Sequence, residues 1–119
     1  PMNNAEIGVI HEFGSEGAHI PPRSFLRMPM EEKRRELMKS FQTATSKAAM
    51  DSGRYREVFR ILGVHAEAIV QEAFATGGFG HWPALQPSTI AAKGSSAILI
   101  DTKKLRQSIT SDVVTKGQL

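Results

Sequence analysis

A histidine beside a glutamate is the first feature of this sequence that suggests chemistry. His11 and Glu12 stand together, as they do in the helix of a zinc protease, but no second histidine follows four residues after the first. The other histidines, His19, His65 and His81, are not spaced three or four residues from one another either. A small hydrolase or metal-dependent enzyme would therefore need the fold to bring together His11, Glu12 and His81, and it would contain a bound metal.

Residues that bind phosphate or act as nucleophiles in other proteins lack the required neighbours here. The stretch GGFG, at 77–80, is not followed by the Lys-Ser or Lys-Thr of a phosphate-binding loop, so we predict a flexible turn. No serine lies in a nucleophile elbow, and Asp101 beside Thr102 is better explained as a helix cap than as a general base. The sequence thus predicts a protein that is not an enzyme and that has no catalytic residues, metal or cofactor.

The composition is that of one globular domain, which we take to cover residues 1–119. Hydrophobic residues make up 40% and charged residues 23%, and there is no cysteine. The lack of cysteine excludes a disulfide scaffold and a thiolate zinc site, and it suits a reducing cytoplasm. No apolar stretch approaches the roughly 18 residues of a membrane span, so we expect no membrane partner. We also expect that terminal strands of the domain are missing from this chain.

The first part of the chain predicts a short strand and then an extended arm. Residues 5–13, AEIGVIHEF, contain β-branched residues that alternate as in a strand, although the spacing of the apolar residues also fits a short helix. Pro21 and Pro22 favour an extended path for residues 20–29. Phe25 would either pin this arm to the core or anchor it on a partner.

Two amphipathic helices are predicted in the middle of the chain, at about 30–50 and 54–75. Apolar residues recur every three or four positions in both segments, as they do on one face of a helix. The break between them, DSG at 51–53, is short, so we expect an antiparallel helical hairpin. Gly63 lies inside the apolar stripe of the second helix, where a close helix crossing would explain it.

The last third of the chain predicts a long connection followed by short elements of both types. A long connection at 75–89 contains three glycines and two prolines. The patterns after it predict a helical turn at 89–93, a buried strand at 97–100, a helix at about 103–110 and the start of a strand at 112–114.

Two blocks of the sequence together carry a resemblance to a known family. The first, IGVIHEFGSEGAHIPPRSFLR at 7–27, contains His-Glu-Phe-Gly and then Ile-Pro-x-Arg-x-Phe-Leu. The second, WPALQPSTIAAKGSSAILIDTKKLRQSI at 82–109, contains Trp-x-x-Leu-x-x-x-Thr-x-x-x-Lys and then Leu-Ile-Asp-Thr-x-x-Leu-x-x-Ser-Ile. Over about half of its length the chain thereby resembles the phage virion-morphogenesis or tail-completion proteins of the head–tail neck. It departs from them at Lys103, where the family pattern has glycine, and in the order of the blocks, which is the reverse in some members.

The resemblance implies both a fold and a function. The implied fold is α+β, with a small, mainly antiparallel sheet packed against the helical hairpin. The implied function is that of a structural protein of a phage or prophage virion, assembled as a ring, commonly a hexamer, that completes or joins the tail to the capsid connector. Expected partners are further copies of the chain, the other neck proteins (connector, stopper, tail terminator or tube) and DNA that passes through the lumen without sequence-specific contacts. The expected location is the virion neck, and the host cytoplasm during assembly.

The resemblance also gives roles to two groups of residues. The arm and the tryptophan are expected to form a subunit or partner interface, because interfaces favour aromatic residues and arginine. This group contains Arg23, Phe25, Leu26, Arg27 and Trp82. A basic surface that faces a neighbouring subunit or DNA is expected at Lys103, Lys104 and Arg106.

Two further hypotheses belong to other classes of protein. A nucleic-acid-binding module would present the arginines of the hairpin to phosphate, and its affinity for DNA would fall steeply as salt concentration rises. These arginines are Arg34, Arg35, Arg54, Arg56 and Arg60. A helical-hairpin adaptor would bind an unidentified protein instead. The net charge of only +3 favours a solvated surface over a dedicated nucleic-acid binder.

Overall fold

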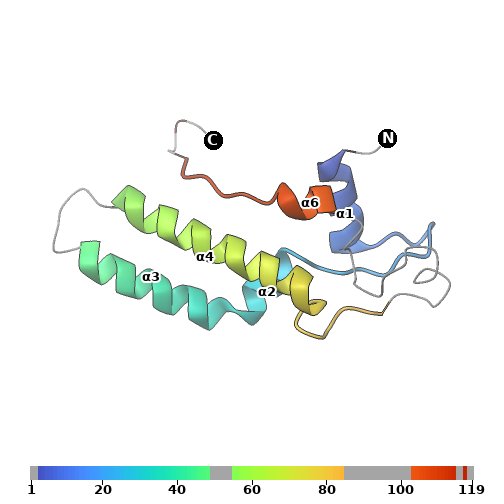
Figure 1. Ribbon diagram of the computed structural model, residues 1–119, viewed down its shortest axis with the longest axis horizontal. Helices are drawn as coiled ribbons and strands as arrows, with labels where there is room; N and C mark the ends of the chain where they lie inside the picture. The colour runs from blue at the N-terminus through green and yellow to red at the C-terminus, as the bar shows by residue number, and fades with distance from the viewer. Residues whose placement is uncertain (1–2, 49–54, 85–102, 115–116, 118–119) are drawn as a thin grey trace.

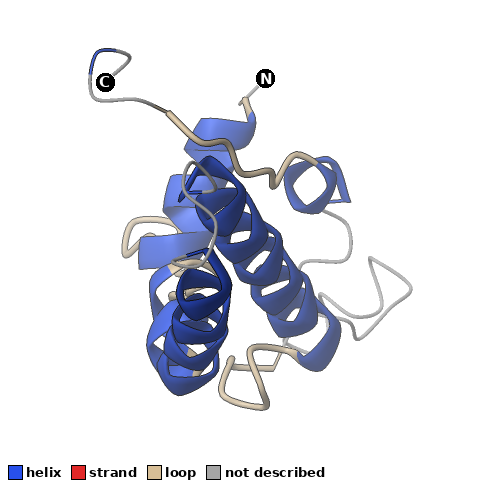
Figure 2. Cartoon of the chain, turned by 90° about the vertical axis from the view of Figure 1, so that its left-hand side faces the viewer, coloured by secondary structure: helices blue, strands red, loops and turns tan. Residues whose placement is uncertain are grey.

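Helices form the fold and arrange it as a long hairpin with a smaller cluster at one end. The computed structural model describes residues 3–48, 55–84, 103–114 and 117. Its helices in these ranges are α1 (Asn4–Phe13), α2 (Arg27–Glu32), α3 (Arg34–Ala48), α4 (Tyr55–Thr76) and α6 (Lys103–Gln107). α3 and α4 lie side by side and antiparallel, and α1 and α6 pack together near the C-terminal end of α4 (Figures 1 and 2). None of the described helices is long and apolar enough to span a membrane.

The expected α+β fold with a mainly antiparallel sheet is wrong. Between residues 3 and 48, and again in 55–84 and 103–114, the only β pairing is one isolated bridge that joins Ser15 to Ile20. The predicted start of a strand at 112–114 is also wrong, since these residues have no strand partner within the described ranges. The predicted strand at 97–100 and helical turn at 89–93 lie outside the residues that the structure describes.

The predicted strand at 5–13 is instead α1, the helical alternative. A capping box starts this helix: the Asn3 side chain accepts a hydrogen bond from the Glu6 backbone N–H at 2.8 Å, and the Glu6 carboxylate accepts one from the Asn3 N–H at 3.0 Å. Gly14 ends the helix with a φ of 75°, a conformation that glycine adopts without strain. These two end signals outweigh the β propensity of the residues between them.

The two longer helices predicted in the middle of the chain are present, with one break that was not foreseen. The segment predicted at 54–75 is α4, whereas the one predicted at 30–50 begins earlier as α2 and is interrupted at Lys33 before α3 starts. Pro29 lies in the first turn of α2, where its missing N–H would have had no helical partner, and it is fully buried. The helix predicted at about 103–110 ends at Gln107 as α6.

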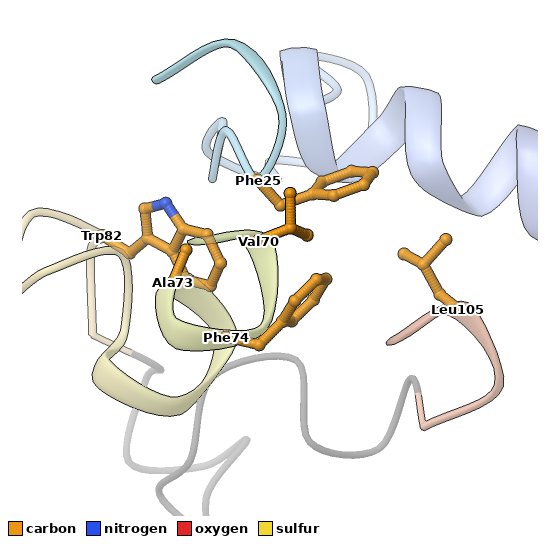
Figure 3. Packing of buried hydrophobic residues seen from close by; sticks show 6 residues of the cluster. All are labelled: Phe25, Val70, Ala73, Phe74, Trp82 and Leu105. Carbon is orange, nitrogen blue, oxygen red and sulfur yellow. The ribbon is translucent and has the colours of Figure 1, made fainter. Parts of the chain in front are cut away.

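The buried core lies where the arm, the C-terminal half of α4, α6 and the loop after α4 meet. Aromatic rings form its centre: the ring centroids of Phe25 and Phe74 are 5.5 Å apart, and Trp82 meets Phe74 edge-on at 5.8 Å. Figure 3 shows these rings together with Val70, Ala73 and Leu105, which complete the cluster. The core therefore occupies one end of a molecule that measures 57 × 30 × 23 Å.

Candidate assembly surface

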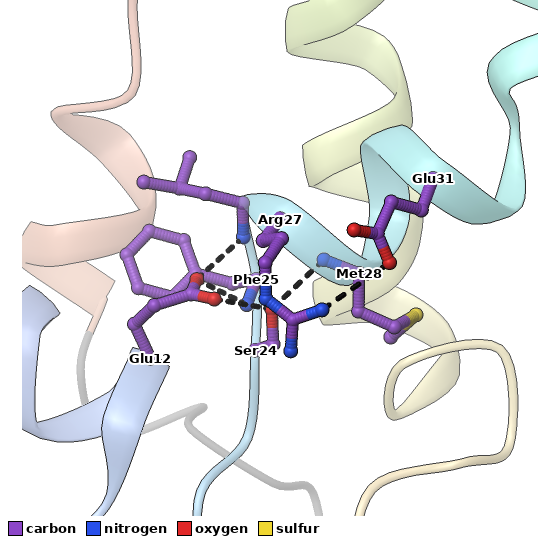
Figure 4. A network of polar contacts seen from close by, with 7 residues as sticks. Glu12, Ser24, Phe25, Arg27, Met28 and Glu31 are labelled. Atoms are coloured by element: carbon purple, nitrogen blue, oxygen red, sulfur yellow. Dashed lines mark hydrogen bonds and ion pairs between the residues drawn. The ribbon is translucent and has the colours of Figure 1, made fainter.

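A buried glutamate holds the arm in place. The Glu12 carboxylate on α1 accepts hydrogen bonds from the backbone N–H groups of Phe25 at 3.1 Å and Leu26 at 2.9 Å, and from the Ser24 hydroxyl (Figure 4). The same Ser24 oxygen accepts a hydrogen bond from the Met28 N–H at 2.9 Å, in the first turn of α2. One carboxylate thus satisfies the backbone donors that stand between the extended arm and α2.

Arg23 and Trp82 fasten the arm to the loop after α4. The Arg23 side chain is buried, and its Nε–H donates a hydrogen bond to the Pro83 carbonyl at 3.0 Å. Burial lowers the pKa of its guanidinium from the ordinary value, but arginine stays protonated in proteins, so the bond keeps its charge assistance. In return, the Trp82 Nε1–H donates to the Ser24 carbonyl at 2.8 Å.

The glycine-rich turn after α4 makes room for the tryptophan. Residues 77–80, predicted to be a turn, do form one. Gly78 has a φ of +69°, and a Cβ added to it would lie 2.2 Å from the Trp82 ring. This position therefore requires glycine for two reasons, the positive φ and the close approach of the ring.

Only two of the five residues predicted to form an interface remain accessible. Phe25, Arg23 and Trp82 are all buried within the subunit, which matches the alternative in which Phe25 pins the arm to the core. The Leu26 side chain is exposed, and so is Arg27, whose guanidinium forms an ion pair with Glu31 one helical turn later at 3.2 Å. A partner that binds this arm would contact Leu26 and Arg27.

The predicted basic surface at the C-terminal helix is smaller than expected. Arg106 is half-buried and points back to α4, where its Nε–H donates to the Gln71 side-chain oxygen at 2.8 Å. The Gln71 amide donates to the Arg106 carbonyl at 2.9 Å in return. Lys104 is exposed, and Lys103 is the first residue of α6. Arg106 therefore connects α6 to α4, and Lys104 remains available to a partner.

The residues of the hypothetical metal-dependent enzyme do not form a metal site. The Glu12 carboxylate accepts hydrogen bonds from backbone N–H groups of the arm. The His81 ring lies on the surface, 3.3 Å from the Glu32 carboxylate. No group of three histidine or carboxylate side chains suited to a metal occurs among the described residues. The arrangement that the structure builds from His11, Glu12 and their neighbours is a structural joint.

Sequence reasoning missed a set of apolar side chains that the fold leaves exposed at its two ends. At the α1 end, Val9 is 58% exposed and Phe13 is 71% exposed, close to Leu26. At the opposite end, Tyr55 and Phe59 on α4 are 61% and 49% exposed. In the sequence these two residues fit the apolar stripe of the helix predicted at 54–75, which suggests that they are buried. The main core cluster contacts only the later part of this helix, at Val70, Ala73 and Phe74, and no local signal in the sequence shows that limit.

The comparisons with known proteins add no relative: no family model matches the chain, and neither the curated proteins nor the solved structures contain a significant match.

Proposed function

We propose that this chain is a structural protein of the head–tail neck of a phage or prophage virion and that it assembles with copies of itself as a ring. In this role it completes the tail or joins it to the capsid connector, and it has no catalytic activity. The helical arrangement of the residues that the structure describes differs from the fold that the resemblance implies. The proposal therefore rests on the two sequence blocks and on the surface of the molecule.

One observation supports the proposal most directly: the two blocks that carry the resemblance pack against each other. Arg23 of the first block donates to the Pro83 carbonyl of the second across 60 residues of sequence, and Trp82 donates back to Ser24 across 58. Leu105 of the second block completes the core around Phe25. Direct contacts between the two blocks are expected if both stabilise the same part of the fold.

The exposed apolar residues support self-assembly. Large apolar side chains that are gathered at exposed sites mark surfaces for protein partners, and aromatic residues contribute most to the affinity of such surfaces. Phe13, Tyr55 and Phe59 are aromatic, and their side chains are 71%, 61% and 49% exposed. An assembly protein uses such residues, whereas an isolated subunit gains nothing from their exposure.

The mass of the purified protein in solution tests the proposal. Light scattering over a concentration series is expected to show an average mass that rises with concentration. Negative-stain images of the largest species are expected to show a ring with a central hole. A chain that stays monomeric up to about 1 mM, where even an association of roughly −4 kcal/mol would be visible, contradicts self-assembly.

The same preparation separates this proposal from the nucleic-acid-binding module. Exposed cations on α3, namely Arg34, Arg35 and Lys39, are the specific feature that favours the second function. Binding of a DNA duplex to the monomer, with an affinity that falls about 40-fold between 50 and 200 mM salt as expected for three phosphate contacts, would favour it. A ring through which DNA passes is expected to show weak binding at all salt concentrations.

A further inference from the structure

The positive charge of this chain is concentrated in one helix. α3 contains four cations and a single carboxylate, so its net charge is +3. The whole sequence also has a net charge of +3, which means that the positive and negative charges of all the other residues cancel. The modest net charge of the chain therefore does not argue against a basic surface, since cations clustered along one helix are the pattern that binds nucleic acid.

The cations of α3 point away from the rest of the hairpin. The half-buried residues Leu37, Phe41 and Ala44 face α4, and the helical repeat places Arg35 and Lys39 on the opposite side. Figure 1 shows α3 along the lower edge of the molecule, with α4 between it and α6. We call the exposed basic and polar residues on this side and its flanks the α3 face: Arg34, Arg35, Lys39, Gln42, Ser46 and Lys47.

These cations are not neutralised within the subunit. All four are exposed, and none forms an ion pair with the residues that the structure describes. The carboxylate of the same helix, Glu36, lies 3.7 Å from the Lys33 amine, so a cation just before the helix already offsets its charge. By contrast, Arg27 and Arg60 each form an ion pair with a glutamate on their own helix. The α3 face therefore retains its positive charge for a ligand.

The side of α3 that carries these cations lacks the side chains that a protein partner requires. Met38 is the only large apolar side chain among the exposed residues of α3. Protein interfaces depend on aromatic and apolar anchors for their affinity, whereas charge contributes mainly to specificity and to the rate of encounter. Gln42 and Ser46 belong, with arginine and lysine, to the residue types that donate hydrogen bonds to phosphate oxygens. The composition of the face thus fits a nucleic-acid backbone better than an acidic protein.

We propose that the α3 face binds duplex DNA through its phosphates, without reading the base sequence. α3 has 15 residues and is about 22 Å long, a length over which each strand of a duplex presents about six phosphates. Only a few cations release counterions in this contact, so each subunit binds weakly and DNA can slide along it. In a ring, this face would meet the DNA that passes through the lumen. The inference goes beyond the proposed function, because it assigns a ligand to one face of the subunit whether or not the subunits form a ring.

Neutral substitutions in the α3 face test the proposal. The affinity of the full chain for a short fluorescent duplex of mixed sequence is measured by anisotropy at several salt concentrations. Three phosphate contacts predict an affinity that falls about 40-fold between 50 and 200 mM salt, and each lost contact makes this fall about 3.5 times smaller. Lys39→Gln should therefore leave a fall of about 12-fold, and the double variant Arg35→Gln, Lys39→Gln a fall of about 3.5-fold. Glutamine forms helices about as well as lysine and arginine, so α3 remains intact in both variants.

A matched control removes the same charge from another surface. Lys104 on α6 is exposed and belongs to the basic surface that the resemblance predicts, so Lys104→Gln should leave the affinity and its salt dependence unchanged. Equal effects of Lys39→Gln and Lys104→Gln would overturn the α3 face as the DNA site. A polyglutamate peptide that binds the chain as tightly as a duplex of equal charge would indicate an acidic protein partner, and it would overturn the proposal as well.

The outcomes distinguish this inference from the proposed function. Salt-dependent binding that the α3 variants weaken, together with rings of the unchanged chain, supports both. The same binding by a chain that stays monomeric supports the α3 face and contradicts the ring. Rings that do not bind the duplex, or that bind it equally well in the α3 variants, overturn the α3 face and leave the ring. A monomeric chain that does not bind the duplex overturns both.

Discussion

Glu12 shows how a single charged residue can serve as a joint between segments. Its carboxylate is buried, yet it accepts hydrogen bonds from the two backbone N–H groups of Phe25 and Leu26 and from the Ser24 hydroxyl. A buried carboxylate is tolerated only when such partners replace its hydration. The glutamate therefore fixes the position of the arm and, through Ser24, the start of α2.

Removal of this carboxylate should destabilise the protein much more than removal of an exposed one. We expect Glu12→Ala to lower the free energy of unfolding by about 2–3 kcal/mol, because it leaves buried backbone donors without partners. Glu12→Gln, which keeps one acceptor oxygen, should lose less. Urea unfolding measures both, and Glu16→Ala on the exposed loop serves as a control that should stay within about 0.5 kcal/mol. Equal losses in Glu12→Ala and Glu16→Ala would contradict the role of the joint.

Two glycines in the turn after α4 allow the cost of a positive φ to be measured separately from the cost of a steric clash. Gly78 and Gly80 have φ values of +69° and +83°, but an added Cβ strikes the Trp82 ring only at Gly78 and meets open space at Gly80. Both alanine substitutions should cost about 1–2 kcal/mol for the positive φ, and Gly78→Ala should cost more. Trp82 is the single tryptophan, so its fluorescence reports the difference. We expect increased quenching by acrylamide in Gly78→Ala alone, and similar quenching in both variants would contradict the clash.

At the scale of elements, the segment after α6 shows why Gly63 lies in a helix. A Cβ at position 63 would lie 2.6 Å from the Ser111 Oγ and 3.0 Å from its Cβ. The Ser111 hydroxyl also donates a hydrogen bond to Glu67, one turn further along α4, at 2.6 Å. The expected close crossing therefore exists, but an extended segment makes it and not a second helix. The glycine lets this segment lie against α4.

An alanine at this position should release the segment while it leaves the helix intact. Alanine favours a helix over glycine by up to about 1 kcal/mol, so Gly63→Ala should not lower the helix content of α4. It should, however, increase proteolytic cleavage at residues 109–113 several-fold. The double variant Gly63→Ala, Ser111→Gly removes the side chain that clashes and should recover much of the resistance to cleavage. Unchanged cleavage in the single variant would show that the crossing is looser than its distances indicate.

The elements that could be predicted from the sequence are those with local signals. The helical period located α3 and α4 because each is long enough to repeat its apolar spacing several times. α1 has local signals too, a capping box at Asn3 and a terminating glycine at Gly14, but its β-branched residues favour a strand and made the prediction wrong. The break at Lys33 has no comparable signal, since it lies within the charged run at 31–36, where no apolar spacing could show that the helix is interrupted.

At the scale of the whole molecule, the contacts that were hardest to predict join segments far apart in the sequence. The Arg23 bond to Pro83 spans 60 residues, and helical spacing within either segment says nothing about the other. The aromatic and arginine residues of the arm predict a partner interface, but Phe25 and Arg23 are buried within the subunit. Residue type alone cannot distinguish an aromatic anchor of the core from an anchor for a partner. That distinction depends on which surfaces the folded chain leaves uncovered.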